Sequence, residues 1–146
     1  MDSRGITFGS DGTSKSVGSE TDLQLLIALR SKAALIVTTG KTARSEQYKA
    51  SRFAPIAFIT KDKNSLASIP AVAEPGSFEN IFLSSEKPLP QAFIEFDNEL
   101  SRAGFPNFLF EGGLESLGSL LKSTLQVSLV LSIANVQDFE EPKALE

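Results

Sequence analysis

A continuous apolar run, "AALIVT" at residues 33–38, is the feature that most constrains the fold. A run of this length without polar alternation is typical of a strand buried on both faces of a parallel sheet. The pattern recurs as "PIAFIT" at 55–60 and, more weakly, as "NIFLS" at 80–84. Further strands are predicted at 5–8, 107–110 and 127–133. The sequence therefore predicts a central sheet with mostly parallel strands.

Helical patterns lie between these strands. Ser19 followed by Asp22 is typical of a helix N-terminus and predicts a helix over 20–31. A second helix is predicted to start at Pro90 and to end at Gly104, and a third to follow the turn at 111–113. Residues 61–77, with two prolines, are expected to form a loop-like connection.

This alternation of strands and helices, joined by short links, predicts an α/β fold. We expect a three-layer arrangement, with a mostly parallel central sheet and helices on both faces. At 146 residues the chain suits a single domain over 1–146. The sequence leaves open whether the acidic tail from about residue 135 folds.

Composition excludes several chemistries. The chain has neither cysteine nor histidine, which removes disulfides, zinc-cysteine sites, Ser-His-Asp hydrolases and Cys-His proteases. Its net charge of −4 disfavours binding to a nucleic-acid backbone. The apolar runs are shorter than the roughly 18 residues that a bilayer-spanning helix needs. We therefore expect no nucleic-acid or membrane partner, no metal, and a cytoplasmic location.

Three polar, glycine-bearing turns follow predicted strands: "GSDG" at 9–12, "TTGKTARSE" at 38–46 and "EGG" at 111–113. In an open α/β sheet, ligands bind beyond the carboxyl ends of the strands, where helix N-termini and glycine turns present free N–H groups. We expect the three turns to form one binding site.

Each turn also has a simpler interpretation. The glycines at 111–113 suit a tight strand-to-helix turn without a ligand, and Asp11 suits an ordinary Asp-Gly turn. Thr42 is expected as the N-cap of a short helix, with Glu46 in its first turns.

Residues 40–42, Gly-Lys-Thr, resemble the end of a phosphate-binding P-loop. Leu35 stands where that loop requires its first glycine, so the strict motif fails. A phosphotransferase that uses Lys41 remains a third, weaker hypothesis. The dinucleotide fingerprint G-x-G-x-x-G is also absent.

In chain order, "GSDG", "LLIALR" at 25–30, "TTGKTARSEQY" at 38–48 and "FLFEGGLESLGSLL" at 108–121 resemble a known pattern. It is that of the dihydrofolate-reductase-like domain found as the reductase of bacterial riboflavin biosynthesis. The resemblance spans about residues 5–133. It implies a dihydrofolate-reductase-like fold, a homodimer, and hydride transfer from NADPH to a ribosylamino-pyrimidine phosphate whose ribose opens to a ribityl chain.

The resemblance also implies residue roles. Asp11 would face the small-molecule substrate, and Arg44 and Glu46 would border the pocket, so these three are the candidate catalytic residues. The implied cofactor-binding residues are Thr38, Thr39, Thr42, Thr60, Glu111, Gly112, Gly113 and Leu114.

A second hypothesis is a nucleotide-binding or dimeric homologue of that family that has lost catalysis. Its motive is that Thr39 and Lys41 stand where the family usually has glycines. Binding without turnover would favour this hypothesis over a working reductase.

Overall fold

The computed structural model describes residues 18–132. The predicted strand at 5–8, the "GSDG" turn with Asp11, and the tail from about 135 lie outside the described residues. The chain divides into two compact units: Leu26–Ser128 forms one, and Met1–Leu25 with Leu129–Glu146 forms the other. The expectation of a single domain stays a prediction.

The unit Leu26–Ser128 is built on a four-stranded, all-parallel sheet with strand order β3-β2-β1-β4. In register, Ile36 of β1 pairs with Ile56 of β2 and with Leu109 of β4. The prediction of an α/β protein with a parallel sheet is confirmed. The strands are β1 Ile36–Thr39, β2 Ile56–Ile59, β3 Ile81–Leu83 and β4 Leu109–Phe110.

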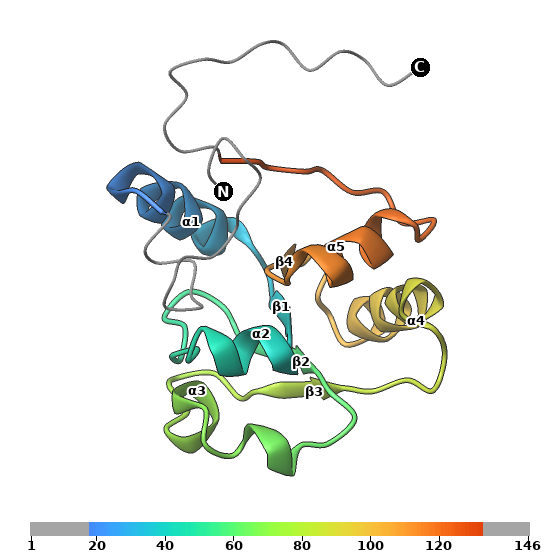
Figure 1. The fold of residues 1–146 in the computed structure, drawn as a ribbon, viewed down its shortest axis with the longest axis horizontal. Helices are drawn as coiled ribbons and strands as arrows, with labels where there is room; N and C mark the ends of the chain where they lie inside the picture. The colour runs from blue at the N-terminus through green and yellow to red at the C-terminus, as the bar shows by residue number, and fades with distance from the viewer. Residues whose placement is uncertain (1–17, 133–146) are drawn as a thin grey trace. The chain divides into compact units, whose positions relative to one another are not determined.

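Helices connect the strands and cover both faces of this sheet (Figure 1). Because side chains alternate along a strand, Val37 joins one core cluster and Ile36 the other. The first cluster packs α4 and α5 against the sheet, and the second packs α2, η1 and α3 against the opposite face. The helices are α1 Glu20–Lys32, α2 Gly40–Ser45, α3 Pro70–Ala73, α4 Leu89–Arg102 and α5 Leu114–Leu121, with a 3₁₀ turn η1 Asn64–Leu66.

Helix α4 confirms its prediction closely. Pro90 lies in its first turn, and Gly104 follows its end with φ of 93°, a conformation that glycine adopts without strain. Phe93, Phe96 and Leu100 recur at helical spacing and are buried against the sheet. Burying a side chain of this size stabilises the fold by roughly 1.5–3 kcal/mol.

Helix α1 begins with the predicted capping pair. The Ser19 backbone N–H donates to Asp22 Oδ2 at 2.8 Å, and the Asp22 N–H donates to Ser19 Oγ at 3.2 Å. Asp22 also accepts a hydrogen bond from the Ser132 hydroxyl. The bonds from Ser132 and Ser19 hold the pKa of Asp22 below its ordinary value.

The predicted strand at 127–133 is wrong for residues 127–132, which form no strand in the structure; residue 133 lies outside the described part. Leu129, Val130 and Leu131 are each 54–56% exposed. A strand needs a neighbouring ladder and a covering layer, and the edge strand β4 is only two residues long. Val127 instead packs against the cluster beneath α4 and α5.

The connection at 61–77 is more ordered than predicted. It contains η1 and α3, and Leu66, Ile69 and Ala71 are fully buried against the second cluster. Pro70 stands at the start of α3, where a missing N–H costs nothing. Short helical turns here let apolar side chains reach the sheet. Among the described residues, no helix has both the length and the hydropathy needed to cross a membrane.

Candidate functional site

The parallel sheet brings the carboxyl ends of its strands to one edge. The turn after β4, residues 111–113, lies beside the start of α2, because the two strands are paired. A Cβ placed on Gly40, the first residue of α2, would lie 3.5 Å from Cβ of Thr60, which follows β2. Polar groups from three turns therefore meet at this edge, as predicted for two of the three turns named from sequence.

Glu111 occupies the centre of the cluster. Arg30 Nε donates to Glu111 Oε1 at 2.8 Å, and Arg30 Nη2 donates to Oε2 at 2.6 Å. The Tyr48 hydroxyl donates to the same Oε2 at 2.7 Å. The two bonds from the guanidinium form a bidentate pair, the strongest geometry between these groups. We call Arg30, Tyr48 and Glu111 the Glu111 clamp.

The clamp is largely removed from water. The Glu111 side chain is 10% exposed and that of Arg30 is 26% exposed. Hydrogen bonds to Glu111 raise the pKa of Arg30 above its ordinary value. Burial, followed by the nearby Glu111 carboxylate, raises the pKa of Tyr48 well above its ordinary 10.0. At neutral pH Tyr48 is therefore a neutral donor and Arg30 a fixed cation.

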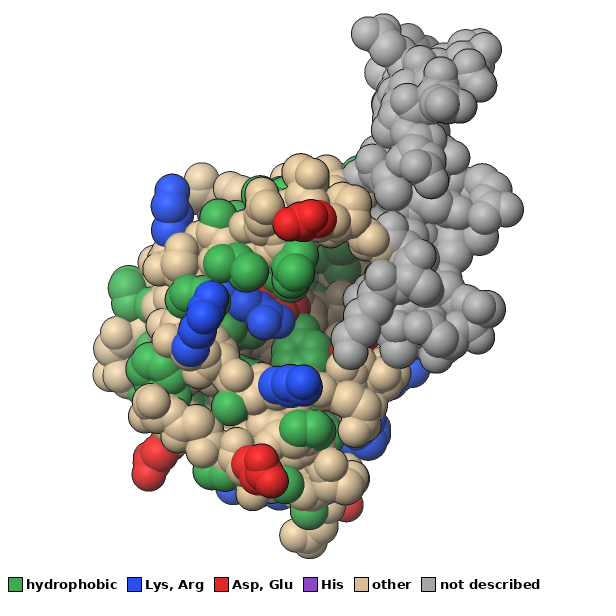
Figure 2. All heavy atoms as spheres, turned by 90° about the vertical axis from the view of Figure 1, so that its left-hand side faces the viewer, with side chains coloured by type: hydrophobic (Ala, Val, Ile, Leu, Met, Phe, Trp, Pro, Cys, Tyr) green, Lys and Arg blue, Asp and Glu red, His purple; other side chains and the backbone are tan. Residues whose placement is uncertain are grey.

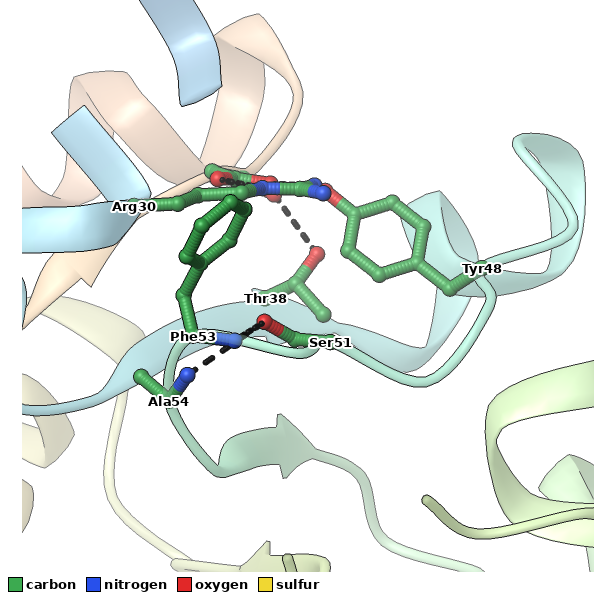
Figure 3. A network of polar contacts seen from close by, with 7 residues as sticks. Arg30, Thr38, Tyr48, Ser51, Phe53 and Ala54 are labelled. Atoms are coloured by element: carbon green, nitrogen blue, oxygen red, sulfur yellow. Dashed lines mark hydrogen bonds and ion pairs between the residues drawn. The ribbon is translucent and has the colours of Figure 1, made fainter. Parts of the chain in front are cut away.

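Figure 3 shows Arg30 and Tyr48 extending toward one another from opposite sides, above Thr38. The Arg30 guanidinium carbon lies 5.7 Å from the centre of the Tyr48 ring. Thr38 is fully buried, and its hydroxyl donates to the Glu111 backbone carbonyl at 2.6 Å. The buried Thr38 side chain thus holds the backbone of the 111–113 turn at Glu111.

A second chain of contacts joins α2 to α5. Thr39 is the N-cap of α2, because its hydroxyl accepts from the Thr42 N–H at 3.2 Å. The prediction of Thr42 as the N-cap is therefore wrong: the helix starts at Gly40, three residues earlier than that interpretation requires. The Thr39 hydroxyl also donates to Thr42 Oγ1 at 3.0 Å, and Gly113 N–H donates to that same atom at 3.1 Å.

Gly112 is required by its neighbours. A Cβ at this position would overlap the Phe110 ring and would lie 2.6 Å from Ser116 Oγ. At Gly113 the nearest atom to such a Cβ is Thr42 Oγ1, at an ordinary 3.7 Å. Gly112 is therefore needed for the strand-to-helix turn, whereas position 113 has room for a small side chain.

The remaining predicted residues are less tightly connected to the clamp. The Thr60 hydroxyl donates to the Asp62 carbonyl at 2.9 Å and closes a local turn. Arg44 is exposed and donates to Ser65 Oγ at 3.1 Å. Glu46 lies at the C-cap of α2 rather than in its first turns, and Leu114, at the start of α5, is 58% exposed.

A separate pocket of about 410 Å³ lies between the end of β3 and α4. No predicted site residue borders it. Glu95 at its wall pairs with Lys87 at 2.5 Å and accepts from Ser85 at 2.6 Å. It is lined by Ser84, Glu95, Phe96, Asn98, Glu99 and Arg102. Residues 18–132 bring together no group of three metal-ligating side chains.

Sequence reasoning assigned no role to Arg30 or Tyr48. Both stand inside the quoted stretches, as the last residues of "LLIALR" and "TTGKTARSEQY". The sequence did contain one signal: Arg30 lies on the same helical face as Leu26 and Ile27. A face that makes only apolar contacts does not need a cation. No protein-family model matches this chain, and no curated protein matches it either.

Proposed function

We propose that this chain is an NADPH-binding reductase domain of the dihydrofolate-reductase-like class, of the type that reduces a ribosylamino-pyrimidine phosphate in riboflavin synthesis. The observation that carries this proposal is the contact between the 111–113 turn and the start of α2, where the Gly113 N–H donates to Thr42 Oγ1. This contact concentrates hydroxyl and backbone N–H groups at the carboxyl edge of the sheet, where such folds bind nucleotides.

The hydrogen-bond donors and the cation near this turn are of the types that bind a pyrophosphate. Helix α5 starts at Leu114 without a side-chain cap, so its first-turn N–H groups point out of the helix beside the glycine turn. Lys41 lies next to this turn, with Nζ 3.9 Å from Glu115 Oε2 in a fully solvated pair. Such a pair is weak and exchanges readily for another anion.

One face of the molecule combines basic and apolar side chains. On the face shown in Figure 2, Lys and Arg side chains border a hollow in which apolar side chains are visible. An anionic ligand with flat rings uses that combination of basic rim and apolar floor. Bound NADPH would supply the hydride, and the chain's own residues would hold it, orient it and exclude water.

Titration of the protein with NADPH, followed by nicotinamide fluorescence, tests the proposal. We expect saturation in the micromolar range, weakened when Thr42→Val removes the hydroxyl beside Gly113. Thr124→Val, at an exposed threonine after α5, is the matched control and should bind as the unmodified chain does. If NADPH, NADP⁺ and NADH all fail to bind, the cofactor proposal is wrong.

A catalytically inactive homologue is the second candidate, and one observation favours it. Both oxygens of Glu111 and the Gly113 N–H already have partners within the protein. Groups satisfied in this way can stabilise a fold without turning over a substrate. NADPH binding without oxidation by pyrimidine or pterin substrates would support this candidate, and measurable oxidation would exclude it.

The phosphotransferase hypothesis has little to support it. Gly40, Lys41 and Thr42 form the first turn of α2 rather than a loop that wraps a phosphate. Magnesium-dependent ATP binding in the same assay would revive it. The proposed homodimer is tested separately, by sedimentation of the full chain over a range of concentrations.

A further inference from the structure

Both oxygens of the Glu111 carboxylate accept hydrogen bonds within the clamp. The two oxygens together accept three hydrogen bonds from two residues, Arg30 and Tyr48. With only 10% of the side chain exposed, the carboxylate has little surface left for a ligand. The side chain of Glu111 is therefore held mainly by the protein's own residues and offers a cofactor little surface.

The backbone of the same residue has a different role. Glu111 N–H donates to the Val37 carbonyl at 2.8 Å, and the Glu111 carbonyl accepts from Thr38. These bonds continue the β1–β4 pairing into the turn. The side chain adds a tether to α1, across 81 residues of sequence. The position of Gly112 and Gly113 thus depends on a residue that lies far away in the chain.

The Arg30–Glu111 ion pair also affects the charge near the candidate site. A carboxylate beside a site for an anionic ligand repels that ligand unless a cation neutralises it. The Arg30 guanidinium provides this neutralisation in bidentate geometry, and Tyr48 adds a neutral donor. Removing Arg30 would leave a buried, unpaired negative charge one residue from the glycines.

We propose that Arg30 and Tyr48 are positioning residues for the dinucleotide: through Glu111 they hold the 111–113 turn in its binding geometry and cancel the charge beneath it. This inference rests on the proposed function, because it assigns the turn to the cofactor's pyrophosphate. Glu111 then acts through its partners and not as a direct contact.

The first test compares NADPH affinity in Arg30→Met, Arg30→Lys and Tyr48→Phe, each checked for folding by circular dichroism. We expect Arg30→Met to weaken binding about 10-fold and Arg30→Lys less, since lysine keeps the charge and loses the planar fork. Arg102→Met is the matched control, at an exposed arginine in the last turn of α4. Unchanged affinity in folded Arg30→Met would overturn the proposal.

A double variant separates charge neutralisation from simple stability. Arg30→Met with Glu111→Gln removes both charges and keeps the shape of the side chain at 111. We expect it to bind more tightly than Arg30→Met alone, because no unpaired charge remains, but less tightly than the unmodified chain, because the tether is lost. Binding no tighter than that of Arg30→Met alone would overturn the charge argument.

A ligand-free measurement keeps the test decisive. Amide hydrogen exchange at Gly113, whose N–H bonds to Thr42, should accelerate in Arg30→Met and Tyr48→Phe but not in Arg102→Met. If the unmodified chain binds no NADPH, the proposed function fails and this exchange alone decides whether the clamp positions the turn. Exchange that is the same in all variants would overturn the positioning role, even if the unmodified chain binds NADPH.

Discussion

Both faces of the sheet in the unit Leu26–Ser128 are packed by an apolar cluster, but only one of them also carries the Glu111 clamp. On the face covered by α4 and α5, Phe93 packs edge to face with Phe96 and with Phe110, at centroid distances of 6.4 and 5.3 Å. The opposite face has a second apolar cluster, and Thr38 and Glu111 lie on the same side of the sheet as Ile36 of that cluster.

The difference shows what each face tolerates. Apolar packing depends on volume, so a substitution of similar size and polarity costs little. A buried ion pair depends on both partners, and loss of one leaves the other charged and desolvated. The α4–α5 face is therefore suited to stability, whereas the clamp face fixes one geometry at the edge where the candidate site lies.

The largest expected effect is on the face covered by α4 and α5. Phe93→Ala should lower the free energy of unfolding by about 4 kcal/mol, because it opens a cavity beneath α4. Phe93→Leu should cost about 1 kcal/mol, since most of the volume remains. Urea unfolding followed by circular dichroism measures both, and Phe78→Ala, at a phenylalanine 36% exposed, is the control. Equal losses of unfolding free energy in Phe78→Ala and Phe93→Ala would contradict this account of the core.

On the clamp face, Arg30→Met should lower the free energy of unfolding by about 3 kcal/mol, because Glu111 is left charged and unpaired. Arg30→Met with Glu111→Met should cost less than the sum of the single changes, as no charge remains buried. The same urea experiment applies, with Arg102→Met as control. Additive losses would show that the two faces do not differ in the way described.

The glycine turn gives a sharper test within one segment. Gly112→Ala should destabilise by about 2 kcal/mol, because its Cβ would meet the Phe110 ring and Ser116 Oγ. Gly113→Ala should change stability by about 0.5 kcal/mol or less, since its backbone is extended and its nearest neighbour is 3.7 Å away. Thermal unfolding of the two variants side by side would show whether position 112 is the restrictive one.

The smallest of the four main losses is expected at Tyr48. Tyr48→Phe should cost about 1.5 kcal/mol at neutral pH, the value of a hydrogen bond to a charged group. The folded-state pKa of Tyr48 lies above its unfolded value of 10.0, so this contribution is fully present below pH 10 and is lost as the pH rises further. In urea unfolding, the free energy of unfolding of the unmodified chain should be lower at pH 11 than at pH 8. The decline should be smaller in Tyr48→Phe. The same pH slope in both chains would contradict the assignment.

Those parts of the fold that depend on local signals could be predicted from sequence. Strand β2 is apolar throughout and β1 begins with two apolar residues, and the Ser19–Asp22 capping pair forms within four residues. The predicted strand at 127–133 failed for the opposite reason, because a strand also requires a partner elsewhere. The polar turns at 38–46 and 111–113 were placed together correctly, since parallel strands end at one edge.

The clamp could not be predicted in the same way. Arg30 and Glu111 are 81 residues apart, and no spacing rule connects them. Their meeting depends on the β1–β4 pairing, which brings Glu111, directly after β4, beside Thr38. The roles of Arg44, Glu46 and Thr60 stay predictions, and Asp11 lies outside the described residues.

Tyr48 has one more consequence. It is the single tyrosine of a chain that has no tryptophan. Its hydroxyl bonds to the Glu111 carboxylate, and a carboxylate that accepts a proton from an excited phenol quenches tyrosine emission. The protein therefore carries its own optical reporter at the clamp. Without any label, brighter emission would signal that the hydroxyl has separated from Glu111, and weak emission would signal that this hydrogen bond remains.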